Sequence, residues 1–198
     1  TALAARLLGK DYKTYVVLGD GECDEGSNWE AAMSAAHYKV TNMISFVDRN
    51  KCMIDGRTED VMKLEPFCDK WTAFGFIVKE IDGNNIKELC EAIDFALENK
   101  TDKPVMIVCN TLKGCGIDFI EDNYLWHYGA FDDEKYHKAK DALAASYAKR
   151  VARADGELIR RAQRSELREC RKERNKSRSR HTGGYAEHIL LRNADIKE

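Results

Sequence analysis

A glycine-rich turn that carries two carboxylates is the first feature of the sequence that could do chemistry. The motif Gly19-Asp20-Gly21-Glu22 directly follows the apolar run 14–18. Glycines let backbone N–H groups approach an anion such as a phosphate closely. A carboxylate repels a bare phosphate, so a carboxylate at the same turn makes sense if a hard divalent cation lies between the two. Taken alone, Gly-Asp-Gly is also an ordinary turn.

A second polar turn lies one structural repeat further along the chain. Asn50 comes 30 residues after Asp20 and closely follows the apolar run 43–47. A strand–helix–strand unit has about this length, so adjacent parallel strands would bring the two turns side by side. An Asp carboxylate, an Asn amide oxygen and a main-chain carbonyl suit Mg²⁺, with phosphate and water oxygens completing the shell. The alternative is that Asn50 only caps a turn, but as a pair the two residues favour a metal–diphosphate site.

The elements that must position these turns alternate between strands and helices. Short apolar and β-branched runs predict strands at 14–18, 43–47, 76–81 and 104–109. Longer segments with an apolar stripe predict helices at 25–39, 64–74, 86–98 and from 134 onward. The pairs Asn84-Asn85 and Asp132-Asp133 are the predicted caps of the last two helices. This alternation predicts an α/β fold with a parallel sheet flanked by helices. Ligands of such sheets bind at the carboxyl ends of the strands, which makes the loops after residues 18, 47 and 109 the candidate site loops.

The composition supports a buried core and excludes several classes of protein. The chain has 198 residues, of which 43% are hydrophobic and 33% charged, and this disfavours wholesale disorder. No apolar stretch approaches about 18 residues, so no membrane span is predicted, and no signal peptide is recognised. The seven cysteines include no Cys-x-x-Cys pair. They are interpreted as reduced thiols of a cytoplasmic protein rather than as disulfides or zinc ligands.

The charge is divided unevenly along the chain. Residues 1–148 hold 26 acidic and 17 basic residues, whereas residues 149–181 hold 13 basic and 5 acidic ones. This shift predicts an α/β domain over 1–148 and a basic tail, helical or disordered, over 149–198. The arginines of the tail could attract a polyanion. Nucleic-acid binding is disfavoured because residues 150–180 contain no aromatic side chain on which bases could stack.

Several motifs in a fixed order resemble the transketolase family. The chain contains GDGECDEGSNWEAAMSAAHYKVTNMISFVDRNKCMIDGRT, which resembles that family's thiamine-diphosphate-binding segment in its GDG, its EG..WEA, its asparagine and its IDG. Further along it contains EIDGNNIKELCEAI and then KPVMIVCNTLKGCGIDFIEDNYLWHYGAF. The last stretch resembles the family's T-x-KG-x-G segment with its following Trp-His pair. The resemblance covers about residues 1–145.

The resemblance implies a fold and two cofactors. The chain would be the diphosphate domain of a thiamine-diphosphate-binding fold, and it would bind thiamine diphosphate and Mg²⁺. The implied metal ligands are the side chains of Asp20 and Asn50 and the main-chain carbonyl of Cys52. The residues implied to contact the cofactor are Gly19, Asp20, Gly21, Glu22, Asn50, Ile54, Lys113 and His127.

Two of the matched positions, His127 and Glu25, are the candidate catalytic residues. His127 matches a position near the reacting carbon, where an imidazole can hydrogen-bond sugar oxygens and move protons; alternatively it is a structural histidine. Glu25 matches an interface glutamate that is expected to couple two active sites; alternatively its carboxylate complements the dipole of the helix that it begins. Lys113 would approach the phosphates and Ile54 the thiazolium ring, although Lys113 could also be an ordinary surface lysine.

The resemblance also implies the reaction and a partner. The family transfers a two-carbon ketol unit from a ketose phosphate to an aldose phosphate, and a glutamate of its pyrimidine domain protonates the cofactor ring. The resemblance extends only to the diphosphate domain and does not include that family's front segment. We therefore expect the N-terminal subunit of a split transketolase, truncated at its front, inactive alone and paired in a hetero-oligomer with a C-terminal subunit. The alternatives are a 1-deoxyxylulose-5-phosphate synthase, a subunit like those of 2-oxo-acid dehydrogenases, or an inactive truncated subunit.

Overall fold

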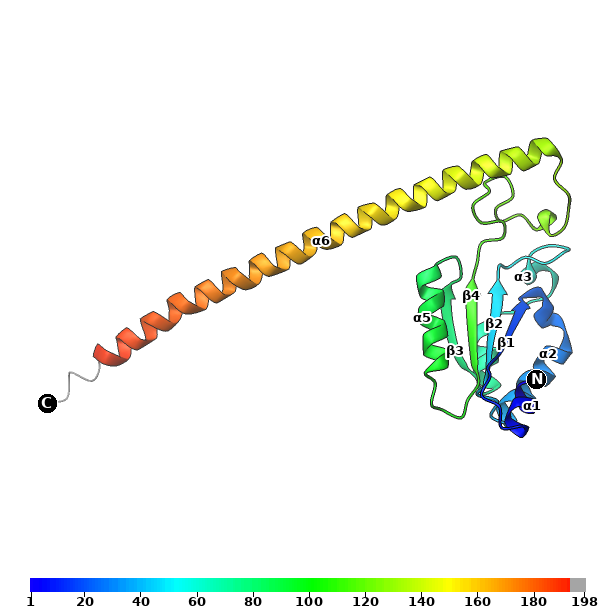
Figure 1. Ribbon diagram of the computed structural model, residues 1–198, viewed down its shortest axis with the longest axis horizontal. Helices are drawn as coiled ribbons and strands as arrows, with labels where there is room; N and C mark the ends of the chain where they lie inside the picture. The colour runs from blue at the N-terminus through cyan, green and yellow to red at the C-terminus, as the bar shows by residue number, and fades with distance from the viewer. Residues whose placement is uncertain (193–198) are drawn as a thin grey trace. The chain divides into compact units, whose positions relative to one another are not determined.

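The chain divides into two compact units, Thr1–Leu143 and Ala144–Glu198, and the computed structural model describes residues 1–192. The first unit carries the sheet (Figure 1). In chain order the elements are α1 (Ala2–Leu7), β1 (Thr14–Gly19), the 3₁₀ turn η1 (Gly21–Asp24), α2 (Gly26–His37), β2 (Met43–Arg49), α3 (Thr58–Val61), α4 (Phe67–Ala73), β3 (Ile77–Asp82), α5 (Ile86–Leu97), β4 (Val105–Asn110), the 3₁₀ turn η2 (Tyr124–Trp126) and α6 (Asp133–Arg192).

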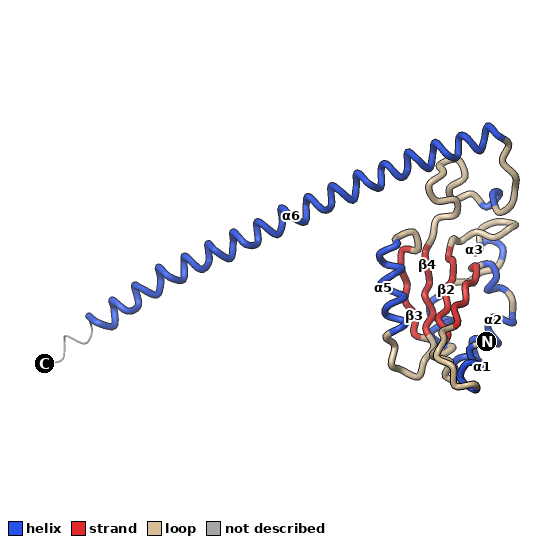
Figure 2. The backbone as a smooth tube through the Cα atoms, viewed as in Figure 1, coloured by secondary structure: helices blue, strands red, loops and turns tan. Residues whose placement is uncertain are grey.

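The four strands form one parallel sheet in the order β1-β2-β4-β3 (Figure 2). The predicted fold class is therefore confirmed. The strands end one or two residues later than predicted, because the ladder continues into polar residues: Gly19 pairs with Asp48, and Arg49 pairs with Asn110. The turns that carry the candidate site residues consequently begin at the carboxyl edge of the sheet itself.

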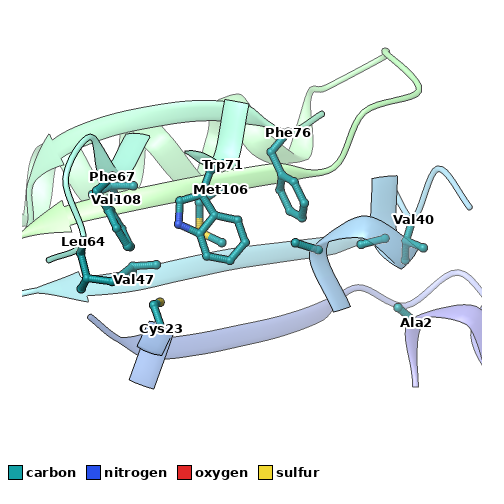
Figure 3. Packing of buried hydrophobic residues seen from close by; sticks show 12 residues of the cluster. Ala2, Cys23, Val40, Val47, Leu64, Phe67, Trp71, Phe76, Met106 and Val108 are labelled. Carbon is teal, nitrogen blue, oxygen red and sulfur yellow. The ribbon is translucent and has the colours of Figure 1, made fainter. Parts of the chain in front are cut away.

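One face of the sheet packs against α2 and α4. Figure 3 shows the indole of Trp71, from α4, lying close to Met106 of β4. The other large members of this buried cluster are Val47, Leu64, Phe67, Phe76 and Val108. Fully burying a large apolar side chain stabilises a fold by about 1.5–3 kcal/mol, so this cluster fixes α4 and the ends of β2 and β4 relative to one another.

The opposite face packs against α5. Ala92 and Ala96 of α5 are buried with Ile44, Ile107 and Cys109 of the neighbouring strands. The predicted cap of this helix is confirmed at Asn85, whose side chain accepts hydrogen bonds from the first turn of α5. Such a cap contributes about 1 kcal/mol. Burial raises the pKa of the Cys109 thiol to about 11, which fits the interpretation of several cysteines as reduced core residues.

The predicted helix at 64–74 is shorter than expected. It begins at Phe67, with Pro66 as its cap. Proline has no N–H to donate and disfavours the helical conformation of the residue before it. Residues 64 and 65 are therefore excluded from the helix, and a separate single turn, α3, precedes them.

The final helix, α6, contains most of the predicted tail. The carboxylate of Asp132 accepts a hydrogen bond from the N–H of Lys135 at 2.8 Å, which agrees with the predicted cap. Residues 149–192 are helical, and the remainder of the predicted tail, 193–198, lies outside the described residues. The predicted domain boundary at residue 148 falls inside α6. Within the described residues, no helix combines the length and apolar character needed to cross a membrane.

Candidate cofactor-binding site

A cavity of about 910 Å³ is present where β1 and β2 end. All ten residues that the sequence analysis assigned to the site line it: Gly19, Asp20, Gly21, Glu22, Glu25, Asn50, Cys52, Ile54, Lys113 and His127. Sequence reasoning did not assign the other lining residues, which are Val17, Leu18, Ser27, Asn28, Asp48, Met53 and Asp55. Of these, two carried a usable signal: Asp48 directly follows the predicted strand 43–47, and Asp55 belongs to the IDG motif.

Asp20 lines the cavity and is only 1% exposed. Its Oδ1 accepts a hydrogen bond from the Gly21 N–H at 2.9 Å. Its Oδ2 accepts one from the Lys51 N–H at 2.6 Å and one from Arg49 Nη1 at 3.1 Å. Burial raises the pKa of this carboxyl, and the bonds from Lys51 and Arg49 oppose that effect. The carboxylate thus joins the ends of β1 and β2.

Arg49 supplies the buried positive charge that accompanies Asp20. Its side chain is 2% exposed and also binds Thr58 Oγ1 at 3.1 Å and Glu65 Oε1 at 2.5 Å. The guanidinium carbon lies 5.0 Å from the centre of the Phe67 ring. Burial disfavours the charge, but the two carboxylates outweigh burial and raise the pKa of Arg49. Asp20 is therefore held in an ion-pair network that the sequence alone did not reveal.

Asn50 and Cys52 form a tight turn beyond β2. The Asn50 Oδ1 accepts a hydrogen bond from the Cys52 N–H at 2.9 Å, and Lys51 between them has a φ of 61°. The alternative role considered for Asn50, capping a turn, is thus observed. An amide oxygen has two lone pairs, so this bond leaves one for another partner.

The donors available to a metal ion are hard oxygens. Asp20, Asn50 and Cys52 line the same cavity, and they could offer a carboxylate, an amide oxygen and a main-chain carbonyl. No group of three or more His, Cys, Asp or Glu side chains able to hold a metal is present among the described residues, so the amide and carbonyl oxygens would be essential. The lining carries five carboxylates but a single lysine, and this surplus attracts a divalent cation. The residues present therefore fit Mg²⁺.

The turn η1 is held in place by the start of α2. The indole N–H of Trp29 donates to the Cys23 carbonyl at 2.8 Å, and the Asn28 amide donates to the Glu22 carbonyl at 2.5 Å. The Trp29 ring also packs 4.8 Å from the ring of Trp71 in the core. The tryptophan of the EG..WEA motif is Trp29, and these contacts show its physical role: it connects the glycine-rich turn to the buried hydrophobic cluster.

The backbone N–H groups of the two glycines, Gly19 and Gly21, have partners within the turn. The Gly19 N–H donates to Glu22 Oε2 at 2.5 Å, and the Gly21 N–H donates to Asp20. The predicted donation from Gly21 to a diphosphate would require this last bond to be exchanged. A Cβ atom at Gly21 would lie 3.1 Å from the Cβ of Met53, so close packing favours glycine at this position.

Lys113 lies in the loop that follows β4. Gly114 next to it has a φ of 70°, and a Cβ atom there would meet Ile120 at 2.8 Å. The Lys113 carbonyl accepts a hydrogen bond from the Asp122 N–H at 2.9 Å. This closed loop carries Lys113 to the cavity.

His127 ends the turn η2 and is exposed at the cavity. Its neighbour Trp126 packs against Phe119 and Phe131, with ring centres 6.0 and 5.4 Å apart. Lys138 covers Phe119 at 4.7 Å. The aromatic cluster thus anchors the segment that presents the imidazole.

Glu25 and Ile54 contribute the remaining assigned side chains. Glu25 precedes α2 as its N-cap residue but makes no side-chain cap hydrogen bond. The side chain of Ile54 is 53% exposed and lines the cavity. An exposed isoleucine at the cavity is available to contact an apolar part of a ligand.

A parallel α/β sheet with its cavity at the strand ends defines the general class of the domain, and comparison with known sequences defines the family. The family described as "Transketolase, thiamine diphosphate binding domain" matches residues 8–190. The chain therefore belongs to the transketolase family, and this membership confirms the resemblance seen in the motifs. The match continues past residue 148, into the segment that the sequence analysis set apart from the family.

The curated relatives include proteins named as single subunits of transketolases. The chain is 41% identical over 138 residues to an apulose-4-phosphate transketolase subunit of Phocaeicola vulgatus, covering 70% of this chain and 49% of that protein. It is also 41% identical over 138 residues to a 6-deoxy-6-sulfo-D-fructose transketolase subunit of a Clostridium species, covering 70% of this chain and 50% of that protein. The chain thus spans about half the length of these relatives.

Solved structures agree with the family assignment. Transketolase from Campylobacter jejuni superposes with a TM-score of 0.65 at 30% identity, over 72% of this chain and 23% of that one. A Pichia stipitis transketolase, whose structure is a complex with sedoheptulose 7-phosphate, superposes with a TM-score of 0.53 at 26% identity, over 75% of this chain and 25% of that one. The described domain therefore has the fold of the thiamine-diphosphate-binding part of transketolases.

Proposed function

We propose that this chain is the diphosphate-holding subunit of a two-chain transketolase that transfers a two-carbon ketol unit from a ketose phosphate to an aldose phosphate. The observation that carries the proposal is that ten residues assigned from the sequence, spread from 19 to 127, line one cavity. Relatives named as transketolase subunits, each about twice the length matched here, support the two-chain organisation.

The metal and the diphosphate would be held by oxygens and cations of this chain. Asp20, Asn50 and the Cys52 carbonyl would hold Mg²⁺, and Lys113 would neutralise a phosphate oxygen. Ile54 would contact the ring of the cofactor. Bound thiamine diphosphate supplies a carbon nucleophile and an electron sink for the transferred unit. The surrounding carboxylates keep the site unfavourable for a diphosphate without its metal ion.

Two further side chains would act on the reaction or on its partner. His127, exposed at the cavity, would hydrogen-bond an oxygen of the sugar and move a proton to or from it near neutral pH. Glu25, which is free of a capping bond, would face the partner chain and couple the two sites. These roles follow the family resemblance, and the cavity brings both residues to the same space.

The partner, the location and the substrates are part of the same proposal. A C-terminal subunit would supply the pyrimidine domain, so the isolated chain would be inactive. Phosphorylated sugars are the proposed substrates, although one relative is named for a sulfonated sugar and another for apulose 4-phosphate. The cytoplasmic location, which was expected from the cysteine usage, and the boundary at residue 148 remain predictions.

Reconstitution of the two chains tests the proposal. The chain would be co-purified with a candidate C-terminal subunit. The complex would be assayed with xylulose 5-phosphate plus ribose 5-phosphate, and separately with pyruvate plus glyceraldehyde 3-phosphate. Ketol transfer in the first assay supports a transketolase, whereas turnover only in the second indicates a 1-deoxyxylulose-5-phosphate synthase. No heat on titration with Mg²⁺ and thiamine diphosphate, with or without the partner, supports the inactive subunit.

Variants of the metal ligands test the site assignment. Asn50→Ala should abolish Mg²⁺-dependent cofactor binding while leaving the Asp20–Arg49 pair intact. Asp20→Ala should also abolish this binding, but it removes the carboxylate partner of the buried Arg49 and should therefore lower stability as well. Asp24→Asn is the matched control, because this exposed carboxylate belongs to the same turn but does not line the cavity. Unchanged binding in the Asn50 variant would exclude it as a ligand.

A further inference from the structure

An exposed arginine joins two loops of the cavity that lie far apart in the sequence. Arg57 Nη1 and Nη2 approach Asp122 Oδ1 and Oδ2 at 2.6 Å each. Nη2 also donates to the main-chain carbonyl of Asp122 at 2.9 Å. A bidentate pair of this kind fixes the relative orientation of its partners as well as their separation. We call these two residues, Arg57 and Asp122, the loop clasp.

The arginine end of the clasp is built into the loop that follows β2. Arg57 pairs with Cys52 in an isolated antiparallel bridge, and its Nη1 lies 3.3 Å from the Cys52 Sγ. The Met53 N–H donates to the Gly56 carbonyl at 2.9 Å, which closes the loop at its tip. A movement of the guanidinium would therefore displace Cys52 and Ile54, which lie in the same loop.

The aspartate end is built into the loop that follows β4. Asp122 has a φ of 56°, and its N–H donates to the Lys113 carbonyl at 2.9 Å. The same loop is tightened at Gly114, whose φ of 70° places it against Ile120. Asp122 thus holds the backbone of the lysine directly, through a single hydrogen bond.

The electrostatics of the two loops agree with this geometry. Burial raises the pKa of the Cys52 thiol, while the cations of Arg57 and Lys113 act in the opposite direction. Cys52 and Lys113 also line the same cavity. The hydrogen bond from Arg57 lowers the pKa of Asp122, so the pair is charged at neutral pH.

We propose that Arg57 and Asp122 are positioning residues, and that the loop clasp sets the distance between the Cys52 turn, on the metal side of the site, and Lys113, on the phosphate side. This inference rests on the proposed function. Neither clasp residue lines the cavity, and both side chains are partly exposed, at 37% and 54%. Loss of the pair should therefore weaken cofactor binding while leaving the global stability nearly unchanged.

A double-mutant cycle on the full-length chain, purified with its partner subunit, tests the clasp. Asp122→Asn keeps a residue type that tolerates a positive φ, and Arg57→Gln keeps most of the aliphatic stem. Each single variant should weaken binding of thiamine diphosphate at saturating Mg²⁺ by about tenfold. The double variant should be no weaker than either single one, because the second change removes nothing that remains. Arg57→Lys, which keeps the charge but cannot bind in a bidentate manner, should fall between wild type and Arg57→Gln.

Two measurements separate positioning from a general structural effect. The melting temperature should stay within about 2 °C of the wild type in every variant, because exposed pairs contribute little to stability. Amide hydrogen exchange, measured without cofactor, should speed up at residues 113–122 in both single variants. The matched control is Asp102→Asn, which breaks the exposed Lys39–Asp102 pair of 2.8 Å and 62% exposure on each side, and it should change neither binding nor exchange in that loop.

The outcomes distinguish the clasp from the proposed function. If the wild type binds cofactor and the clasp variants bind it equally well, the inference is overturned. If the wild type binds no thiamine diphosphate at all, the proposed function fails, and exchange at residues 113–122 alone decides whether the clasp couples the loops. Unchanged exchange in that case overturns the clasp as well.

Discussion

Two arginine–aspartate pairs lie near the same cavity and differ mainly in their access to water. Arg49 and Asp20 are 2% and 1% exposed and share the network with Glu65 and Thr58. The pair Arg57–Asp122 is 37% and 54% exposed. A buried ion pair carries a large desolvation cost, so removing one partner leaves the other uncompensated. An exposed pair contributes little to the free energy of folding. Its geometry matters because it fixes the relative position of the two backbone segments that carry it.

Removing the buried cation should have the largest effect on stability. Arg49→Met leaves Asp20 buried beside no positive charge, and the free energy of unfolding should fall by about 3–5 kcal/mol. Urea denaturation measures this loss. Arg57→Met is the matched control, and it should cost about 1 kcal/mol or less. Adding Asp20→Asn to Arg49→Met should restore part of the loss, and equal losses at the two arginines would contradict the comparison.

A steric change at Gly114, in the loop that follows β4, should have an effect of intermediate size on stability. Gly114→Ala requires a non-glycine residue at a φ of 70° and a Cβ atom 2.8 Å from Ile120. The backbone conformation alone costs about 1–2 kcal/mol. Hydrogen exchange at residues 113–122 should accelerate more than in Asp122→Asn. If the variant keeps the wild-type exchange pattern, the loop is not held as tightly as the packing indicates.

Glu65, a carboxylate bound to Arg49, should give a smaller effect on stability, and this effect should depend on pH. The pKa of Glu65 is lowered, first by the hydrogen bond from the Phe67 N–H and then by Arg49. Because the folded pKa lies below the unfolded value of 4.5, the stabilisation is present above that pH and is lost as the pH falls through the folded pKa. Glu65→Gln should therefore be less stable than wild type at pH 7, by about 1 kcal/mol or less for this half-exposed group.

Urea denaturation at a series of pH values checks that prediction. Urea midpoints measured between pH 7 and pH 3 should converge for the wild type and Glu65→Gln as the pH decreases. A gap that stays constant over this range would mean that the charge of Glu65 contributes nothing.

The smallest stability change is expected for the exposed aspartate. Asp122→Asn should alter the free energy of unfolding by about 0.5 kcal/mol or less. High salt screens exposed pairs more than buried ones, so raising the ionic strength to about 1 M should reduce the cofactor-binding difference between Asp122→Asn and wild type. The stability difference of Arg49→Met should change less under the same conditions.

The sequence alone was sufficient to predict the four strands, their parallel pairing and the residues that meet at the edge of the sheet. The spacing between Asp20 and Asn50 equals one strand–helix–strand unit, so parallel pairing had to bring them together. The family motifs then added Lys113 and His127, which come from loops that periodicity does not place. Local rules also located the cap at Asn85, because a capping side chain acts within its own turn.

The contacts that hold those residues could not be predicted from the sequence. Arg49 meets a carboxylate 29 residues away, and Arg57 meets one 65 residues away. Such pairings depend on how loops close in three dimensions and leave no periodic signal. The start of α4 at Phe67 could have been predicted, because Pro66 restricts the residue before it.

The indole of Trp29 links the site to a circular dichroism signal. Its ring lies 4.8 Å from that of Trp71 at an angle of 35°, close enough for the strong far-ultraviolet transitions of the two indoles to couple and to produce a paired circular dichroism band. The same indole is bound to the Cys23 carbonyl of the glycine-rich turn. Any rearrangement of that turn on ligand binding should therefore change this band, so the protein carries its own spectroscopic reporter without an added label.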